Sequence, residues 1–191
     1  MRNPAEREIK KDVVLSKCFE CLTEKGIEAI TIKDFSEATG MAASSIYYWF
    51  EDKDEIVLDA VEWGLDEYVK IIFDFAFEHT DDLVKLCEGI KALAQENKKQ
   101  FRLIFQIATS PQYGESVRKF SDKLDYGYKR YTETLAEKLD MSFDKLFPFV
   151  NLFISVFVDC VMWDSWEKFD METNSILKMI NGYPEHHRLM F

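Results

Sequence analysis

The stretch Thr31–Lys53, TIKDFSEATGMAASSIYYWFEDK, constrains the fold most, because it reads as two short helices joined by a glycine turn. Thr31 and Asp34 have the spacing of a capping box, which predicts that the first helix begins here. Ile32, Phe35 and Thr39 recur at helical intervals and are predicted to face a core. Gly40 should end this helix, since glycine adopts a left-handed conformation at little cost. The stretch therefore predicts a helix-turn-helix.

The second helix of this pair is predicted at Ala42–Trp49, with Ile46 and Phe50 turned inward at a spacing of one helical turn. The remaining faces of this helix carry small hydroxyl and aromatic side chains and no charge: Ser44, Ser45, Tyr47, Tyr48 and Trp49. Such a surface is unusual unless another molecule packs on it. DNA is the partner that this arrangement favours.

Few helix breakers interrupt the rest of the chain. The 191 residues include 7 Gly and 4 Pro, and 47% of the residues are hydrophobic. This composition excludes a disordered chain, and long stretches lack strand-like alternation, so we predict an all-α protein. Besides the helix-turn-helix, the helices are expected at Pro4–Lys25, Lys53–Phe77, Asp81–Asn97, Lys98–Thr109, Gln112–Leu139, Phe143–Phe169 and Met171–Asn181. Only a weak break separates Asp81–Asn97 from Lys98–Thr109, so these two could be one bent helix.

The most apolar stretch, Phe147–Trp163, is shorter than a typical membrane span and contains three polar residues. We interpret it as a buried helix and expect no membrane association. The polar N-terminus shows no signal peptide, which favours a cytoplasmic protein.

The charge balance argues against a strongly DNA-binding surface. The net charge is −11, and in residues 1–56 twelve acidic side chains face eight basic ones. A DNA-binding face would have to gather the few cations on one side. Weak non-specific binding is expected.

The four cysteines do not predict a metal or redox site. Cys18 and Cys21 form a CxxC motif, but it lies within a helical pattern without a second ligand pair. We interpret the cysteines as reduced structural thiols and expect no metal and no cofactor. The sequence also has no Gly-rich phosphate loop, nucleophile elbow or HExxH motif, so we predict that the protein is not an enzyme.

An N-terminal three-helix pattern followed by GMAASSIYYWFEDKDEI resembles the TetR/AcrR family of bacterial transcriptional regulators over residues 10–58. The resemblance implies a helix-turn-helix domain at residues 1–52 and a helical ligand-binding and dimerisation domain at residues 53–191. It further implies a homodimer, in most cases a repressor, that leaves a double-stranded DNA operator when a small-molecule effector binds. One departure is Ala42, because the family has Ser or Thr before the recognition helix.

The resemblance also implies DNA contacts at particular residues. Thr31 would bond a phosphate, and Lys33 would reach a phosphate or a base edge. Base edges or thymine methyl groups would meet Ser44, Ser45 and Tyr48 in a recognition surface that includes Ala43. Phosphates would be held by Tyr47 and Lys53, and Trp49 could do either. Helix packing is an alternative role for Tyr47.

The C-terminal part is rich in aromatic residues, most of them expected in a core. A subset could line a cavity for a small apolar or aromatic ligand. The candidates are Phe101, Phe105, Tyr128, Tyr131, Phe153, Asp159 and Trp163.

Three interpretations remain open for a polar line at Asn151, Ser155 and Asp159, which recur every four residues. The line could be a solvated seam, polar pairing in a dimer bundle, or a stripe facing the ligand. In the last case Asp159 would favour a cationic ligand, because a buried carboxylate needs a partner.

The rival interpretation of the whole chain is a helical ligand-binding or protein-interaction module with little DNA affinity. The acidic N-terminal part and the missing Ser or Thr at position 42 support it. Selection of DNA sequences by the protein would distinguish the two.

Overall fold

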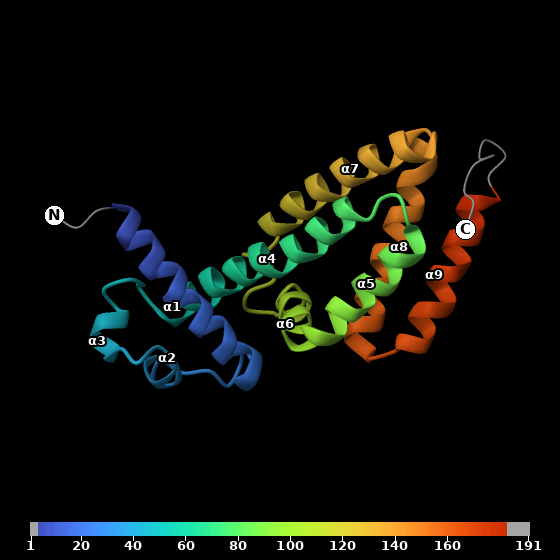
Figure 1. The fold of residues 1–191 in the computed structure, drawn as a ribbon. Helices are drawn as coiled ribbons and strands as arrows, with labels where there is room; N and C mark the ends of the chain where they lie inside the picture. The colour runs from blue at the N-terminus through green and yellow to red at the C-terminus, as the bar shows by residue number, and fades with distance from the viewer. Residues whose placement is uncertain (1–3, 183–191) are drawn as a thin grey trace. The chain divides into compact units, whose positions relative to one another are not determined.

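The computed structural model describes residues 4–182, with side chains described from Lys11 onward, and leaves out residues 1–3 and 183–191. The described residues form α-helices and no strand, which confirms the predicted all-α class (Figure 1). The helices are α1 (Pro4–Lys25), α2 (Ile32–Thr39), α3 (Ala43–Ile46), α4 (Lys53–Glu78), α5 (Leu83–Glu96), α6 (Lys98–Ile107), α7 (Lys119–Leu139), α8 (Phe143–Trp163) and α9 (Trp166–Asn181).

The chain folds into two compact units, and each is built from separate stretches of sequence. The first unit comprises residues 1–69 and 99–118, and the second comprises residues 70–98 and 119–191. Helix α4 contributes to both units. The predicted functional division at residues 52 and 53 is a different boundary and stays a prediction.

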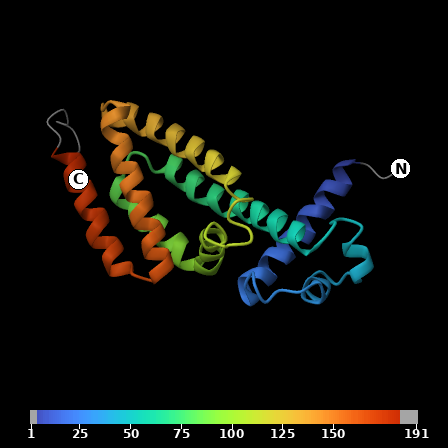
Figure 2. The same cartoon turned by 180° about the vertical axis from the view of Figure 1, so that it is seen from behind.

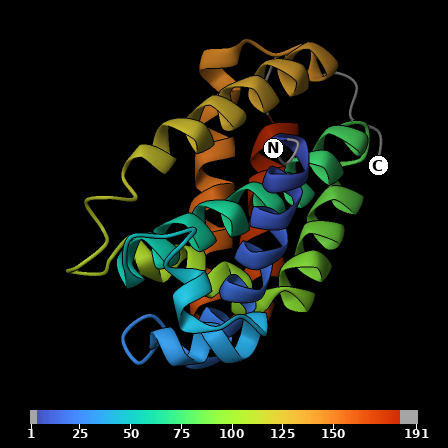
Figure 3. The same ribbon diagram turned by 90° about the vertical axis from the view of Figure 1, so that its left-hand side faces the viewer.

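Aromatic side chains from three helices form the core of the first unit. The ring of Phe19 in α1 stacks on Tyr68 in α4 with centroids 5.5 Å apart, and Tyr68 meets Phe101 of α6 edge-on at 6.2 Å. Gly64 permits this approach, because a Cβ atom there would lie 2.1 Å from the Phe19 ring. Helix α2 packs against α1, and α3 lies beside α2 (Figure 3).

The second unit is a bundle of helices, in which α8 and α9 lie side by side (Figures 1 and 2). Its core includes the fully buried Leu146 of α8 and Phe169 of α9. Gly127 of α7 permits a close approach, because a Cβ atom there would lie 2.6 Å from the Phe73 ring of α4. Small residues thus let helices approach in both units.

Three predicted boundaries of the last three helices are wrong. Helix α7 begins at Lys119 rather than Gln112, because residues 111–118 form turns. Helix α8 ends at Trp163 rather than Phe169, because Asp164 adopts a left-handed conformation (φ 60°). Helix α9 begins at Trp166 rather than Met171. The chain therefore reverses between α8 and α9, which allows the two helices to pack together.

Helix α8 is the one helix of the described residues that is long and apolar enough to cross a membrane by length and composition. The core helix of a soluble protein passes the same test. Only 33% of the most apolar 18-residue stretch of α8 is buried within the chain. Much of the surface of α8 is therefore left uncovered by the described residues.

Candidate DNA interface

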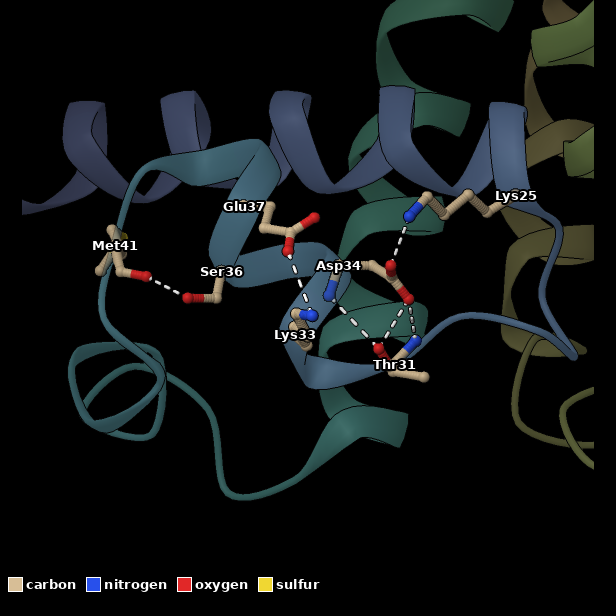
Figure 4. Close-up of polar contacts among 7 residues, drawn as sticks. All are labelled: Lys25, Thr31, Lys33, Asp34, Ser36, Glu37 and Met41. Atoms are coloured by element: carbon tan, nitrogen blue, oxygen red, sulfur yellow. Dashed lines mark hydrogen bonds and ion pairs between the residues drawn. The ribbon is translucent and has the colours of Figure 1, made fainter.

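Helix α2 begins with the predicted capping box, drawn in Figure 4. The backbone N–H of Asp34 donates to the Thr31 hydroxyl at 3.3 Å, and the backbone N–H of Thr31 donates to Asp34 Oδ2 at 2.8 Å. Gly40 adopts a left-handed conformation (φ 70°) and ends the helix, as predicted. Both ends of α2 are thus specified by local sequence.

The Asp34 carboxylate is also the centre of a small charged cluster. It accepts a hydrogen bond from the Thr31 hydroxyl at 2.6 Å and forms an ion pair with Lys25 at the end of α1. The hydrogen bonds from Lys25 and then from Thr31 lower the pKa of Asp34 to about 2. The carboxyl group is therefore fully ionised at neutral pH.

This cluster bears on the predicted phosphate contact of Thr31. The hydroxyl proton of Thr31 is directed to Asp34 (Figure 4), so a phosphate would have to compete with a carboxylate for it. The ion pair with Lys25 balances the negative charge of Asp34, which reduces its repulsion of a DNA phosphate. A DNA phosphate would therefore be bound more readily by the backbone N–H groups at the exposed start of α2 than by the Thr31 hydroxyl.

Lys33 lies on the exposed side of α2, where its ammonium group is 3.7 Å from Glu37 Oε1. Both side chains are largely exposed, so this pair contributes little to stability and can separate. Ser36 on the same helix donates to the carbonyl of Met41 at 2.5 Å and holds the turn toward α3 (Figure 4).

The short helix α3 carries the predicted recognition surface. Ile46 and Phe50 are buried, as predicted, and fix the orientation of the helix. Tyr47 and Tyr48 are 53% and 72% exposed. The small side chains Ala43, Ser44 and Ser45 are exposed beside them, so the predicted face is presented to solvent.

Helix α3 is shorter than the predicted Ala42–Trp49. Its N-cap residue, Ala42, makes no side-chain hydrogen bond, which agrees with the expected loss of a cap. After Ile46 the chain continues in turns, in which the N–H of Trp49 donates to the carbonyl of Ile46 at 2.8 Å. Trp49 is half-buried, and its ring meets Tyr48 edge-on at 6.0 Å.

Lys53 is the first residue of α4 and is half-buried. The start of this helix is capped, because Asp52 Oδ1 accepts a hydrogen bond from the N–H of Glu55 at 2.8 Å. Lys33 and Lys53 are thus cations on α2 and α4, the helices that precede and follow α3 in the chain.

Sequence reasoning did not foresee a contact between the start of α4 and the segment after α6. The hydroxyl of Tyr113 donates to Asp54 Oδ1 at 2.7 Å, and the Gln112 amide donates to the same carboxylate at 3.0 and 2.9 Å. The bond from Tyr113, and then that from Gln112, lower the pKa of Asp54. The pairing spans 59 residues of sequence, so no local pattern could have revealed it.

The seven candidate ligand residues are divided between the two units. Phe101 and Phe105 belong to the first unit, where Phe101 is a core residue. Tyr131 and Phe153 line a cavity in the second unit. The ring of Tyr128 packs 5.4 Å from Phe73, whereas Trp163 is 76% exposed.

The polar line on α8 lies on its accessible side. Asn151 and Ser155 are exposed, and the Ser155 hydroxyl donates to the carbonyl of Asn151 at 2.9 Å. Asp159 forms an ion pair with Lys168 of α9 at 2.6 Å. Because Asp159 already has a cationic partner, the solvated-seam and dimer-pairing interpretations fit this geometry better than a ligand-facing stripe does.

The cysteines of α1 are buried thiols. Burial raises the pKa of Cys18 to about 12, so its thiolate is scarce at neutral pH. Among the described residues there is no cluster of three or more His, Cys, Asp or Glu that could hold a metal ion.

Comparison with known proteins identifies relatives of the helix-turn-helix region and of the fold. The family model described as "Bacterial regulatory proteins, tetR family" matches residues 14–60, which include α2 and α3. The chain is 23% identical over 107 residues to the biofilm operon icaADBC HTH-type negative transcriptional regulator IcaR of Staphylococcus epidermidis. This match covers 53% of the chain and 55% of IcaR.

A second relative is the HTH-type transcriptional repressor KstR2 of Mycolicibacterium smegmatis, 23% identical over 73 residues, or 36% of each protein. The chain thus matches about half of IcaR and about a third of KstR2. The fold extends further. The crystal structure of a TetR transcription regulator from Haloarcula marismortui superimposes with a TM-score of 0.66, over 91% of this chain and 97% of that one, at 14% sequence identity.

The family model matches residues 14–60, and the fold match covers 91% of the chain. Both matches are consistent with the helix-turn-helix described above, in which α2 is capped, Gly40 is left-handed and α3 is exposed. The chain therefore carries, at residues 14–60, the N-terminal domain of the bacterial regulatory proteins of the tetR family, and its fold is similar to that of a solved TetR regulator.

Proposed function

We propose that the protein is a cytoplasmic, DNA-binding transcriptional repressor that acts as a homodimer on a palindromic operator. The observation that carries the proposal is the presentation of α3, with Ile46 and Phe50 buried and the tyrosines and serines outward. IcaR and KstR2 are described as a negative regulator and a repressor, which supports repression rather than activation.

The recognition surface favours a particular kind of DNA contact. It offers no Arg, Lys, Asn or Gln between Gly40 and Phe50, so it cannot form the bidentate base contacts that discriminate guanine and adenine strongly. Serine hydroxyls and a tyrosine ring can contact base edges and thymine methyl groups. Lys33 and Lys53 would hold phosphates and position the helix without reading sequence.

The uncovered surface of α8 and α9 supports the homodimer. Leu152, Trp163, Met171 and Met179 are large apolar side chains that are exposed on these two helices. A second copy of the chain would cover them, and its α8 would bring the polar line at Asn151 and Ser155 opposite a partner helix. A twofold dimer of this kind requires an operator with twofold symmetry.

Release from DNA would follow from binding of a small apolar effector in the second unit. An effector can shift the protein only if it binds the DNA-competent and the released conformations with different affinities. Helix α4 belongs to both units and carries Lys53 at its start, so it is the natural connection.

Selection of bound duplexes from a random-sequence library, at low salt, tests the proposal. We expect enrichment of a near-palindrome whose half-sites are about 34–36 Å apart, one helical turn or a multiple of it. Low salt is used because each lysine–phosphate contact weakens as the salt concentration rises, and a protein with a net charge of −11 makes few such contacts. Selected pools without an enriched symmetric sequence would instead favour the interaction-module alternative.

A further inference from the structure

Helix α7 carries opposite charges on the two halves of its exposed face. The helix lies at the edge of the second unit (Figure 1), and the side chains of this face recur at alternating intervals of four and three residues. These intervals place side chains along one line of a helix, where a second helix can meet them. The residues of this line, all exposed, are Lys119, Lys123, Tyr126, Arg130, Glu133 and Glu137. The basic residues come first along the line and the acidic residues come last.

This order of charges is unfavourable for a helix on its own. Lys119 and Lys123 are four residues apart, and so are Glu133 and Glu137. Side chains four residues apart are neighbours on a helix surface, and like charges in such a pair repel each other. A helix exposed only to solvent would be more stable with the two signs alternating. The separation of the signs therefore indicates a partner that supplies opposite charges to both halves.

A second copy of α7, running antiparallel, fits both halves at once. If two copies pair about a twofold axis at the level of Tyr128, Lys119 lies opposite Glu137 of the second copy. In the same register, Lys123 lies opposite Glu133 of the second copy. The twofold axis repeats each pair, because the same surface is used by both chains. The face is thus complementary to itself in charge from one end to the other.

The centre of this pairing brings Tyr126 of one copy opposite Arg130 of the other. Within one chain the guanidinium group of Arg130 lies 6.0 Å from the centroid of the Tyr126 ring. Tyr126 is 65% exposed, so most of its ring is open to the guanidinium group of a second copy. Arginine and tyrosine attract each other in this way through a cation–π contact. The centre of the contact therefore adds to the ion pairs on either side of it.

We propose that this face of α7 is a self-complementary contact between two copies of the chain, separate from the surface of α8 and α9 that supports the homodimer. Exposed ion pairs contribute little individually, so the contact is weak. It forms where the local concentration of the chain is high, and it would join homodimers to one another. The proposal goes beyond the proposed function, because pairing of α7 needs neither DNA nor an effector.

Carbodiimide cross-linking, which joins a lysine directly to a carboxylate, detects this contact. Lys119 and Glu137 are about 27 Å apart along α7, at about 1.5 Å per residue, so they cannot be joined within one chain. A cross-link between them therefore reports two copies. We expect it in the full chain at low salt and at about 0.1–1 mM protein, the concentration range of weak contacts. Mixing isotope-labelled and unlabelled chains shows by mass spectrometry that the link joins different chains.

Charge swaps at Lys123 and Glu133 test the register and leave Lys119 and Glu137 available as the reporter pair. Lys123→Glu or Glu133→Lys alone makes this pair repulsive twice over and should lower the yield of the reporter cross-link about 10-fold or more. The double variant should restore the yield. An equimolar mixture of the two single variants should also restore it, because a chain with glutamate at both positions then meets a chain with lysine at both. A variant that failed to fold would not be rescued by mixing.

Lys85→Glu and Glu88→Lys, on the exposed surface of α5, make the same changes in net charge and should leave the yield unaltered. Three results would overturn the inference: no reporter cross-link in the unaltered protein, an unchanged yield in the single variants, or no recovery in the double variant or the mixture. None of these measurements uses DNA. A protein that selects a palindrome but shows no α7 contact thus retains the proposed function and loses this inference.

Discussion

At the scale of single residues, Asp34 combines a helix cap with an ion pair. Its carboxylate accepts hydrogen bonds from the Thr31 backbone and hydroxyl and pairs with Lys25. Each of these contacts favours the ionised form, which is why its pKa falls from 3.8 to about 2. A group whose pKa is depressed on folding stabilises the protein above its unfolded pKa and loses that contribution as the pH falls.

We therefore expect the contribution of Asp34 to be fully present at neutral pH and to disappear between pH about 4 and about 2. Asp34→Asn should lower the free energy of unfolding at pH 7, and the difference from the unaltered protein should vanish toward pH 2. Denaturant unfolding followed by circular dichroism over this pH range measures it. Glu37→Gln, which removes an exposed ion pair on the same helix, should show no comparable difference at pH 7.

Tyr48 and Lys53 should affect DNA binding in different ways. Tyr48→Ala removes an exposed ring from the recognition surface and should alter the preferred sequence, at a cost of about 1–3 kcal/mol at the affected base pair. Lys53→Ala should weaken all sites alike and reduce the salt slope by about one. Binding to the selected operator and to single-base variants at several salt concentrations separates the two. The opposite assignment of effects would mean that α3 docks in another orientation.

At the scale of helices, α3 lacks a side-chain N-cap, although its backbone geometry would allow one. Ala42 already has the extended backbone of an N-cap residue (φ −64°, ψ 146°) but makes no side-chain hydrogen bond. Ala42→Ser should therefore stabilise the protein by about 0.5–1 kcal/mol, measured by chemical denaturation. Ala43→Ser, one position into the helix, supplies the same hydroxyl without the cap geometry and should give no gain.

The segment after α6 should depend on its contact with the first turn of α4. Tyr113 is buried, and its hydroxyl donates to Asp54. Tyr113→Phe should cost about 1–2 kcal/mol of unfolding free energy, because a charge-assisted hydrogen bond is lost while Gln112 still serves the carboxylate. Thermal unfolding of this variant, compared with Tyr126→Phe, tests the assignment; equal stabilities would remove Tyr113 as an anchor of the segment.

Local sequence was sufficient for the parts of the fold that depend on neighbouring residues. The Thr31 capping box, the left-handed Gly40 and the burial of Ile46 and Phe50 were all predicted and are present. The boundaries that were missed depend on distant contacts or on rarer backbone choices. Tyr113 is held by Asp54, 59 residues away, and Asp164 adopts a left-handed conformation that Asp does not usually adopt.

The candidate ligand residues likewise depend on distant contacts that no local pattern predicts. Aromatic content suggested a cavity, but whether an aromatic side chain packs in a core or lines a space depends on the assembled helices. Phe101 and Tyr131 are both buried, yet Phe101 packs against Tyr68 and Tyr131 lines the cavity. No spacing along the chain distinguishes them.

At the scale of the whole molecule, self-association should depend on the exposed apolar residues of α8 and α9. Leu152→Glu places a charge among them and should weaken a dimer by about 2 kcal/mol or more, about 30-fold in dissociation constant. Sedimentation equilibrium measures the change. Ile71→Glu is a matched control, since Ile71 in α4 is 40% exposed and Leu152 is 41% exposed. A monomer at micromolar concentration before any substitution would remove the dimer from the proposal.

The first unit draws its residues from two separate stretches of the chain, 1–69 and 99–118. The ring of Tyr68 packs against Phe101, and Asp54 accepts a hydrogen bond from Tyr113, so side chains of the two stretches contact each other directly. A recombination point directly after the recognition helix would therefore separate residues that contact each other within the first unit. A hybrid that takes residues 1–69 from one parent and the remainder from another would join surfaces with different evolutionary histories. A working exchange of DNA specificity should have to carry residues 99–118 along with the N-terminal stretch.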